Sequence, residues 1–128
     1  RYRRAIGAER VQVWADVKKK HSSHAITADL GIGDVAHAVE FMRGDAVIVT
    51  GSVTGDAPRQ ADLDEVKGRA HLPVYLGSGV TDQNLRSYLS KADGFIVGSH
   101  FKEDGHWSRP VDPRRVEVFM QVHAGAVG

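Results

Sequence analysis

The chain alternates four times between a short apolar segment and a segment whose apolar residues fall at helical spacing. We expect strands at 11–17, 46–49, 74–76 and 95–97, and helices over about 34–43, 62–70, 85–92 and 113–123. Successive strand starts lie about 20 to 35 residues apart, which leaves room for a crossover helix between parallel strands. This order predicts an α/β fold built on a parallel sheet.

Residues at the expected helix ends support the assignment. Asp34 and Asp112 are predicted N-caps, because a short side-chain oxygen can accept a free N–H of the first turn. Pro113 suits the first position of the last helix. The inner face predicted for that helix consists of Val116, Phe119, Met120 and His123.

The positions of the glycines distinguish two α/β architectures. An open doubly wound sheet usually carries a glycine-rich turn after its first strand, whereas here that strand ends in Asp16 and a run of lysines. Glycines instead follow the third and fourth strands, as in TIM barrels, where the loops after strands seven and eight hold phosphate. We therefore predict a (β/α)4 half of a TIM (β/α)8 barrel, equivalent to strands five to eight.

Length and composition set further limits. A complete barrel takes roughly 250 residues, so the 128 residues here are expected to form one domain, the C-terminal half, with the N-terminal half apparently absent. A net charge of +1 does not call for nucleic acid, and the absence of cysteine excludes disulfides and thiolate metal sites. No apolar run is long enough to span a bilayer, and we expect a cytoplasmic protein. The chain begins without Met, so a lost N-terminal segment could have carried a targeting signal.

Two glycine turns form the strongest local signal for a ligand. Backbone N–H groups at such turns can approach an anion closely, and serine adds a hydroxyl donor. The residues predicted to bind phosphate are Gly77, Ser78, Gly79, Gly98 and Ser99. The alternative is that both are ordinary tight turns between strand and helix.

A second cluster follows the first strand. Alternation along that strand places Asp16 opposite the valines, so it should point into a barrel near the end where such barrels carry out chemistry. We predict catalytic roles for Asp16, Lys20 and His21, and substrate contacts for Lys18, Ser22, Thr50, Gly51, Thr54, Asn84 and His100. The alternative for the first group is a solvated basic loop beside a structural ion pair. No metal site is predicted, since the spacing of His21 and His24 has little meaning on a loop.

Four spaced segments, VWADVKKKHS, DAVIVTGSVTG, LGSGVTDQN and DGFIVGSHFK, resemble the BtpA family over nearly the whole chain, which corresponds to the C-terminal half of the family's length. The resemblance carries over Asp16, Lys20, His21 and Ser22, then Thr50, Gly51, Thr54 and Gly55, then 77–81 with Asn84, and lastly Gly98 and Ser99. Two positions depart from the expected pattern: three lysines precede His21, so that Lys18 and Lys20 compete for one role, and His100 replaces a small or apolar residue.

The resemblance implies a phosphate-binding TIM barrel, either an enzyme acting on a small phosphorylated or nucleoside-like or sugar-like metabolite, or a non-catalytic factor in photosystem I biogenesis. A photosystem role would add peripheral membrane association. A third alternative is a half-barrel that associates with itself, because an isolated half leaves sheet edges open. No cofactor is predicted, and flavin mononucleotide, which binds barrels through the same loops, stays open. The missing half or a second copy is the expected protein partner.

Overall fold

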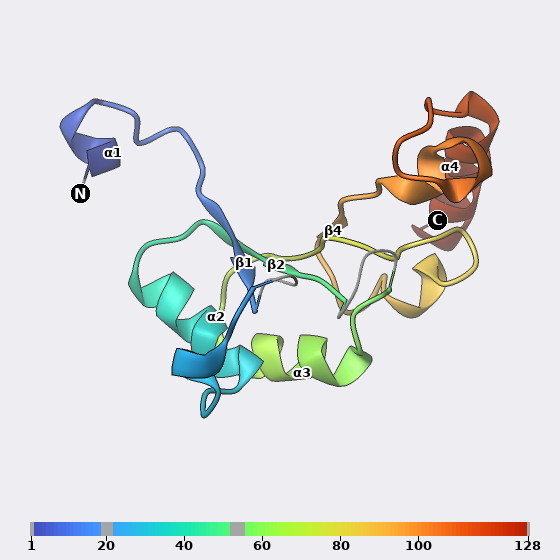
Figure 1. Cartoon of the computed structure of the whole chain (residues 1–128). Coiled ribbons are helices and arrows are strands. Elements are labelled where there is room, and N and C mark those ends of the chain that lie inside the picture. The colour runs from blue at the N-terminus through green and yellow to red at the C-terminus, as the bar shows by residue number, and fades with distance from the viewer. Residues whose placement is uncertain (1, 19–21, 52–55, 128) are drawn as a thin grey trace.

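The computed structural model describes residues 2–18, 22–51 and 56–127. Four strands form one sheet in chain order: β1 (Trp14–Val17), β2 (Ala46–Val49), β3 (Val74–Leu76) and β4 (Gly94–Phe95). Every neighbouring pair is parallel, and helices lie between the strands along the chain (Figure 1). The predicted α/β fold with a parallel sheet is confirmed, and its four strand–crossover units are consistent with half of a barrel.

The helices are α1 (Tyr2–Ala5), α2 (Ile32–Phe41), α3 (Gln60–Arg69) and α4 (Pro113–Val127), with short 3-10 turns η1 (Ala25–Thr27), η2 (Leu85–Ser87), η3 (Ser99–Phe101) and η4 (Glu103–Gly105). Figure 1 shows α2 and α3 side by side under the sheet, while α1 stands away from it. Helix α4 packs near η2 and η3, beyond β4. The two glycine turns therefore leave the sheet toward α4.

The core lies between the sheet and the pair α2 and α3. Register places Val17, Val49 and Leu76 in one row across three strands, and all are buried. Leu63 and Val66 of α3 are fully buried against this side. The continuous apolar strands thus gain their burial from one helical layer, which is what drives the sheet and helices together.

The opposite face of the sheet carries Trp14, Asp16, Ile48 and Tyr75. The rings of Trp14 and Tyr75 stack with centroids 4.1 Å apart, although Trp14 remains 40% exposed. Gly94 makes this possible, because an added Cβ would lie 2.4 Å from Cε1 of Tyr75. Trp14 and Asp16 therefore lie on the side predicted to face the inside of a barrel, and no helix in the described part of the chain covers it (Figure 1).

Both outer strands are shorter than predicted. The first strand begins at Trp14, which pairs with Ala46, the first residue of β2. The Val13 carbonyl still accepts the Asp45 N–H at 2.8 Å, but no residue of β2 lies opposite it. Val11 and Val13 are 57% and 47% exposed. The fourth strand covers Gly94–Phe95 instead of 95–97, since the chain turns into η3 soon after Ile96 donates to the Leu76 carbonyl.

Two helix starts also differ from expectation. Gly31 is the N-cap of α2, and Asp34 lies three residues further on, where its Oδ2 accepts the Gly31 N–H at 3.2 Å. Helix α3 begins at Gln60, slightly before the predicted start at Asp62. For α4 the prediction is confirmed: Oδ1 of Asp112 accepts the Arg114 N–H at 2.9 Å, with Pro113 at the first helical position.

The helix expected over 85–92 is a short 3-10 turn, η2. Ser87 donates both its N–H, at 3.0 Å, and its hydroxyl, at 2.7 Å, to the Asn84 carbonyl. Serine side chains that bond nearby carbonyls compete with the α-helical pattern. The prediction for the inner face of α4 was also partly wrong. Phe119 is buried and Val122 packs on the core, whereas Met120 is 51% exposed.

Candidate functional site

A cavity of about 350 Å3 lies between the turn after β3 and the turn after β4. It is lined by all five residues predicted to bind phosphate: Gly77, Ser78, Gly79, Gly98 and Ser99. His100, Gly105 and Arg115 contribute to the same wall. Turns that are about 20 residues apart in sequence meet here because parallel neighbouring strands end at the same edge of a sheet.

The glycines in the first turn are required by packing. Gly79 has a φ of +69°, and an added Cβ would lie 2.2 Å from the backbone nitrogen of Ala57. A Cβ on Gly77 would lie 2.6 Å from Cγ2 of Ile48. Around Gly98, in contrast, no atom lies within 4 Å of such a Cβ. Packing therefore explains the first two glycines, while Gly98 leaves open space beside the cavity.

The side chain of Ser78 joins the loops after β2 and β3. Its hydroxyl donates to the Asp56 carbonyl at 3.0 Å and accepts the Gly51 N–H at 3.2 Å. Gly51 was predicted to contact substrate, yet its N–H is occupied by this bond. Both residues consequently hold the wall of the cavity in place.

Asn84 closes the turn after β3. Its Oδ1 accepts the Thr81 N–H at 2.8 Å, and its Nδ2 donates to the Gly79 carbonyl at 2.9 Å. Thr81 in turn accepts the Asn84 N–H through its hydroxyl at 3.4 Å. Such reciprocal bonds stabilise a turn, so the described geometry gives Asn84 a structural role; its predicted contact with substrate stays a prediction.

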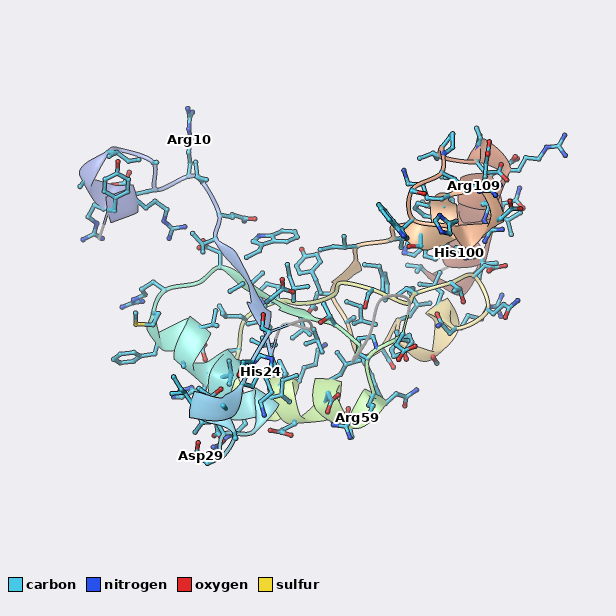
Figure 2. The ribbon with its side chains drawn as sticks, in the orientation of Figure 1. Arg10, His24, Asp29, Arg59, His100 and Arg109 are labelled. Carbon is cyan, nitrogen blue, oxygen red and sulfur yellow. The ribbon has the colours of Figure 1, made fainter. Side chains whose placement is uncertain are left out.

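His100 links the two turns. Its Nε2 lies 3.2 Å from Oδ1 of Asp82, and the ring is only partly exposed. Burial lowers the pKa of His100 below its ordinary value of 6.5, and the nearby Arg115 lowers it further, while the Asp82 carboxylate opposes both effects. The histidine therefore favours its neutral form and connects the cavity wall to α4, beside which Figure 2 shows it.

Sequence reasoning did not single out Arg115 as a site residue. It lies in the first turn of α4, and its Nε–H donates to the His100 carbonyl at 2.6 Å. Its distance in sequence from either glycine turn hid this role. The signal available in the sequence was an arginine in the first turn of a predicted helix that follows the second glycine turn along the chain.

The groups predicted near β1 are only partly brought together. Asp16 is exposed on the open face of the sheet, and Ser22 is exposed as well. Lys18 has a φ of +49°, and its Nζ donates to the Leu30 carbonyl in the loop before α2. Lys20, His21 and Thr54 lie outside the described residues. Lys18 and Lys20 were both considered for one role, and the structure shows that Lys18 is hydrogen-bonded away from the cavity.

Thr50 directly follows β2 and has a buried hydroxyl. Its Oγ1 is shielded from solvent and has no hydrogen-bond partner among the residues that the structure describes. Its Cγ2 lies 2.8 Å from the place where a Cβ of Gly77 would be. Thr50 therefore lies at the junction of the β2 and β3 ends, next to the glycine turn.

The family model for BtpA matches residues 1–125. The chain belongs to the BtpA family. Among its relatives, a mitochondrial protein of Caenorhabditis elegans described as uncharacterised is 42% identical over 94% of this chain and 43% of its own length. The photosystem I biogenesis protein BtpA of Synechocystis is 34% identical over 97% of this chain and 43% of its own length. An uncharacterised protein of Pyrococcus furiosus is 35% identical over 98% and 47%, respectively.

This BtpA-family chain spans a little under half the length of these relatives. No solved structure shows significant similarity to it. Across the described ranges, no helix is both long and apolar enough to cross a membrane. The resemblance drawn from the four sequence segments is confirmed, and the relatives are about twice as long as this chain.

Proposed function

We propose that this BtpA-family chain is part of a phosphate-binding TIM barrel that acts as an enzyme on a small phosphorylated, nucleoside-like or sugar-like metabolite. The observation that supports this is the single cavity lined by both glycine turns, Gly77–Gly79 and Gly98–Ser99, with Arg115 in its wall. Backbone N–H groups and a cation around one space are the components of an anion site. In TIM barrels, the loops after the last two strands commonly provide such a site.

The rest of the barrel would come from the portion of the protein that the relatives contain and these residues do not. The support is the open sheet face with its partly exposed Trp14 and the edges of β1 and β4. Unpaired strand edges and exposed apolar faces favour association. A second copy of the chain is the other candidate for covering the open sheet face. Sedimentation of the 128-residue chain tests the second source: a monomer that melts cooperatively would exclude self-association.

Asp16 would be the general acid or base, or would orient a ribose, with Lys20 or His21 assisting. Its place on the open face supports this, because inward carboxylates at the ends of barrel strands are well placed for proton transfer. Asp16→Asn in the protein with its natural flanking residues should lower turnover by about 100-fold or more. Asp29→Asn, an exposed change away from the sheet (Figure 2), is the matched control. Unchanged turnover in Asp16→Asn would refute the assignment.

A ligand screen tests the proposal as a whole. Phosphate, ribose 5-phosphate, nucleosides, nucleotides and flavin mononucleotide would be added separately, and the melting temperature recorded. A ligand at 100 times its Kd adds about 2.7 kcal/mol to the unfolding free energy, which corresponds to several degrees for a domain of this size. A selective shift with one phosphorylated compound would support the proposal, while no shift with any anion would contradict it.

A second candidate is a non-catalytic role in photosystem I biogenesis. It rests on the name of the Synechocystis relative, and it would bring peripheral association with membranes. Purification from native extract should then recover a specific protein partner, and no compound in the screen should be converted. Turnover of any substrate that Asp16→Asn abolishes would exclude this candidate.

A further inference from the structure

Arg115 brings a positive charge into the wall of the cavity between the two glycine turns. Its backbone belongs to the first turn of α4, and the side chain is partly buried. The Nε–H donates to the His100 carbonyl at 2.6 Å, which orients the guanidinium. A Cβ placed on Gly105 would lie 3.6 Å from Nη2, an ordinary contact distance, so this edge of the guanidinium lies next to Gly105.

This charge has no carboxylate partner within 4 Å in the part of the chain that the structure describes. Asp82, which lines an adjacent cavity together with Arg115, has its Oδ1 3.2 Å from Nε2 of His100 instead. Arg3, which is partly buried like Arg115, does have such a partner in Asp45. A partly buried arginine is usually paired, so the cavity contains a cation whose counter-charge is not supplied by the described chain.

The residues that line the cavity come from three segments: the turn Gly77–Gly79, the turn Gly98–Ser99, and Arg115 of α4. In the first turn, the Gly77 N–H and the Ser78 hydroxyl already donate to the Val49 and Asp56 carbonyls. With Nε occupied by the His100 carbonyl, the two terminal nitrogens of the guanidinium remain as a parallel pair of donors. Paired N–H donors match two oxygens of one phosphate.

We infer that Arg115 is a binding residue that selects ligands ending in a phosphate monoester. The inference rests on the proposed phosphate site in this cavity and adds a residue and a ligand class to it. A monoester presents three free oxygens and close to two negative charges near neutral pH, which is enough for the two terminal nitrogens of Arg115 and for one backbone N–H of a glycine turn. A diester presents two free oxygens and a single charge, so it leaves one set of donors and part of the charge unmatched.

Calorimetric titration with methyl phosphate and dimethyl phosphate tests the inference in the protein with its natural flanking residues. The unaltered protein should bind methyl phosphate at least about 10-fold more tightly than dimethyl phosphate, because a charged hydrogen bond is lost with the latter. Arg115→Met should weaken methyl phosphate binding by about 10- to 100-fold. Arg114→Met is the matched control, since Arg114 is the adjacent residue of the helix, is exposed and does not line this cavity. The affinity of this variant for methyl phosphate should stay within about two-fold of that of the unaltered protein, as expected for an exposed charge.

Each outcome decides the matter. Wild-type affinity in Arg115→Met would overturn the role of Arg115 and leave the phosphate site standing. Equal losses in both arginine variants would overturn it too, as they would reflect the general charge of α4. Absence of methyl phosphate binding in the unaltered protein would remove the proposed phosphate site along with the inference. If Arg115→Met does not fold, Arg115→Lys decides: it keeps the charge but lacks the fork, so several-fold weaker binding supports the inference and unchanged binding refutes it.

Discussion

Gly79 is the position at which one added methyl group should destabilise the fold most. Its φ of +69° lies in the left-handed region, where a side chain with a Cβ costs about 1–2 kcal/mol relative to glycine. The new Cβ would also lie 2.2 Å from the Ala57 nitrogen and 2.2 Å from the Asp56 carbonyl carbon, both backbone atoms that cannot rotate away. Overpacking typically adds about 1–3 kcal/mol. Gly79→Ala should therefore lower the unfolding free energy by about 2–5 kcal/mol.

Gly68→Ala is the matched control for this change. Gly68 lies inside α3, and no atom is within 4 Å of its added Cβ. Because alanine favours a helix over glycine, this variant should be more stable by up to about 1 kcal/mol. Urea unfolding followed by circular dichroism would measure both variants, with the m-value checked for a change in the unfolded state. The reasoning is refuted if Gly79→Ala lies within about 0.5 kcal/mol of the parent, the range of an ordinary surface change.

Two further predictions concern the same wall. Ser78→Ala should lower the unfolding free energy by about 1–3 kcal/mol in urea titrations, because it leaves the Gly51 N–H and the Asp56 carbonyl without their bonds to Oγ; an unchanged midpoint would contradict this. His100→Gln should flatten the pH dependence of stability just below pH 6.5, measured by thermal melts from pH 5 to 8. Since burial lowers the pKa of His100 in the folded state, the unfolded chain takes up the proton first as pH falls, and the parent loses stability there. Identical profiles for both proteins would show that His100 does not titrate differently on folding.

Local patterns were enough for much of the fold. The apolar runs at Val47–Val49 and Val74–Leu76 became strands that pack one face on the helices, because continuous apolar runs are typical of strands in parallel sheets. Asp112 and Pro113 marked the start of α4, since capping depends on residues within one turn. The limits of β1 and β4 were wrong for a different reason: an outer strand ends where its neighbour ends, which no local pattern encodes.

The candidate site was predictable to a similar degree. Glycines at two strand ends were visible as a pattern, and parallel pairing brought both turns to one cavity as expected. The placement of Asp16 on the sheet face opposite Val17 followed from the two-residue period of a strand, and the register agrees with it. The hydrogen bonds of side chains in the cavity wall could not be predicted from the sequence. Those of Ser78 join loops that are about 20 residues apart, and they depend on how closely these loops pack.

The sequence by itself therefore determined the order of strands and helices, the parallel sheet and the two glycine turns, because periodicity, capping and turn chemistry act over a few neighbouring residues. Only the tertiary structure decided that Arg115 joins the wall of the cavity, that Asp82 pairs with His100, and that Gly79 must be a glycine for packing as well as for its backbone angle. Those features arise where distant segments meet, and the distances of a few ångströms that define them are set by how α4 and the strand ends pack together.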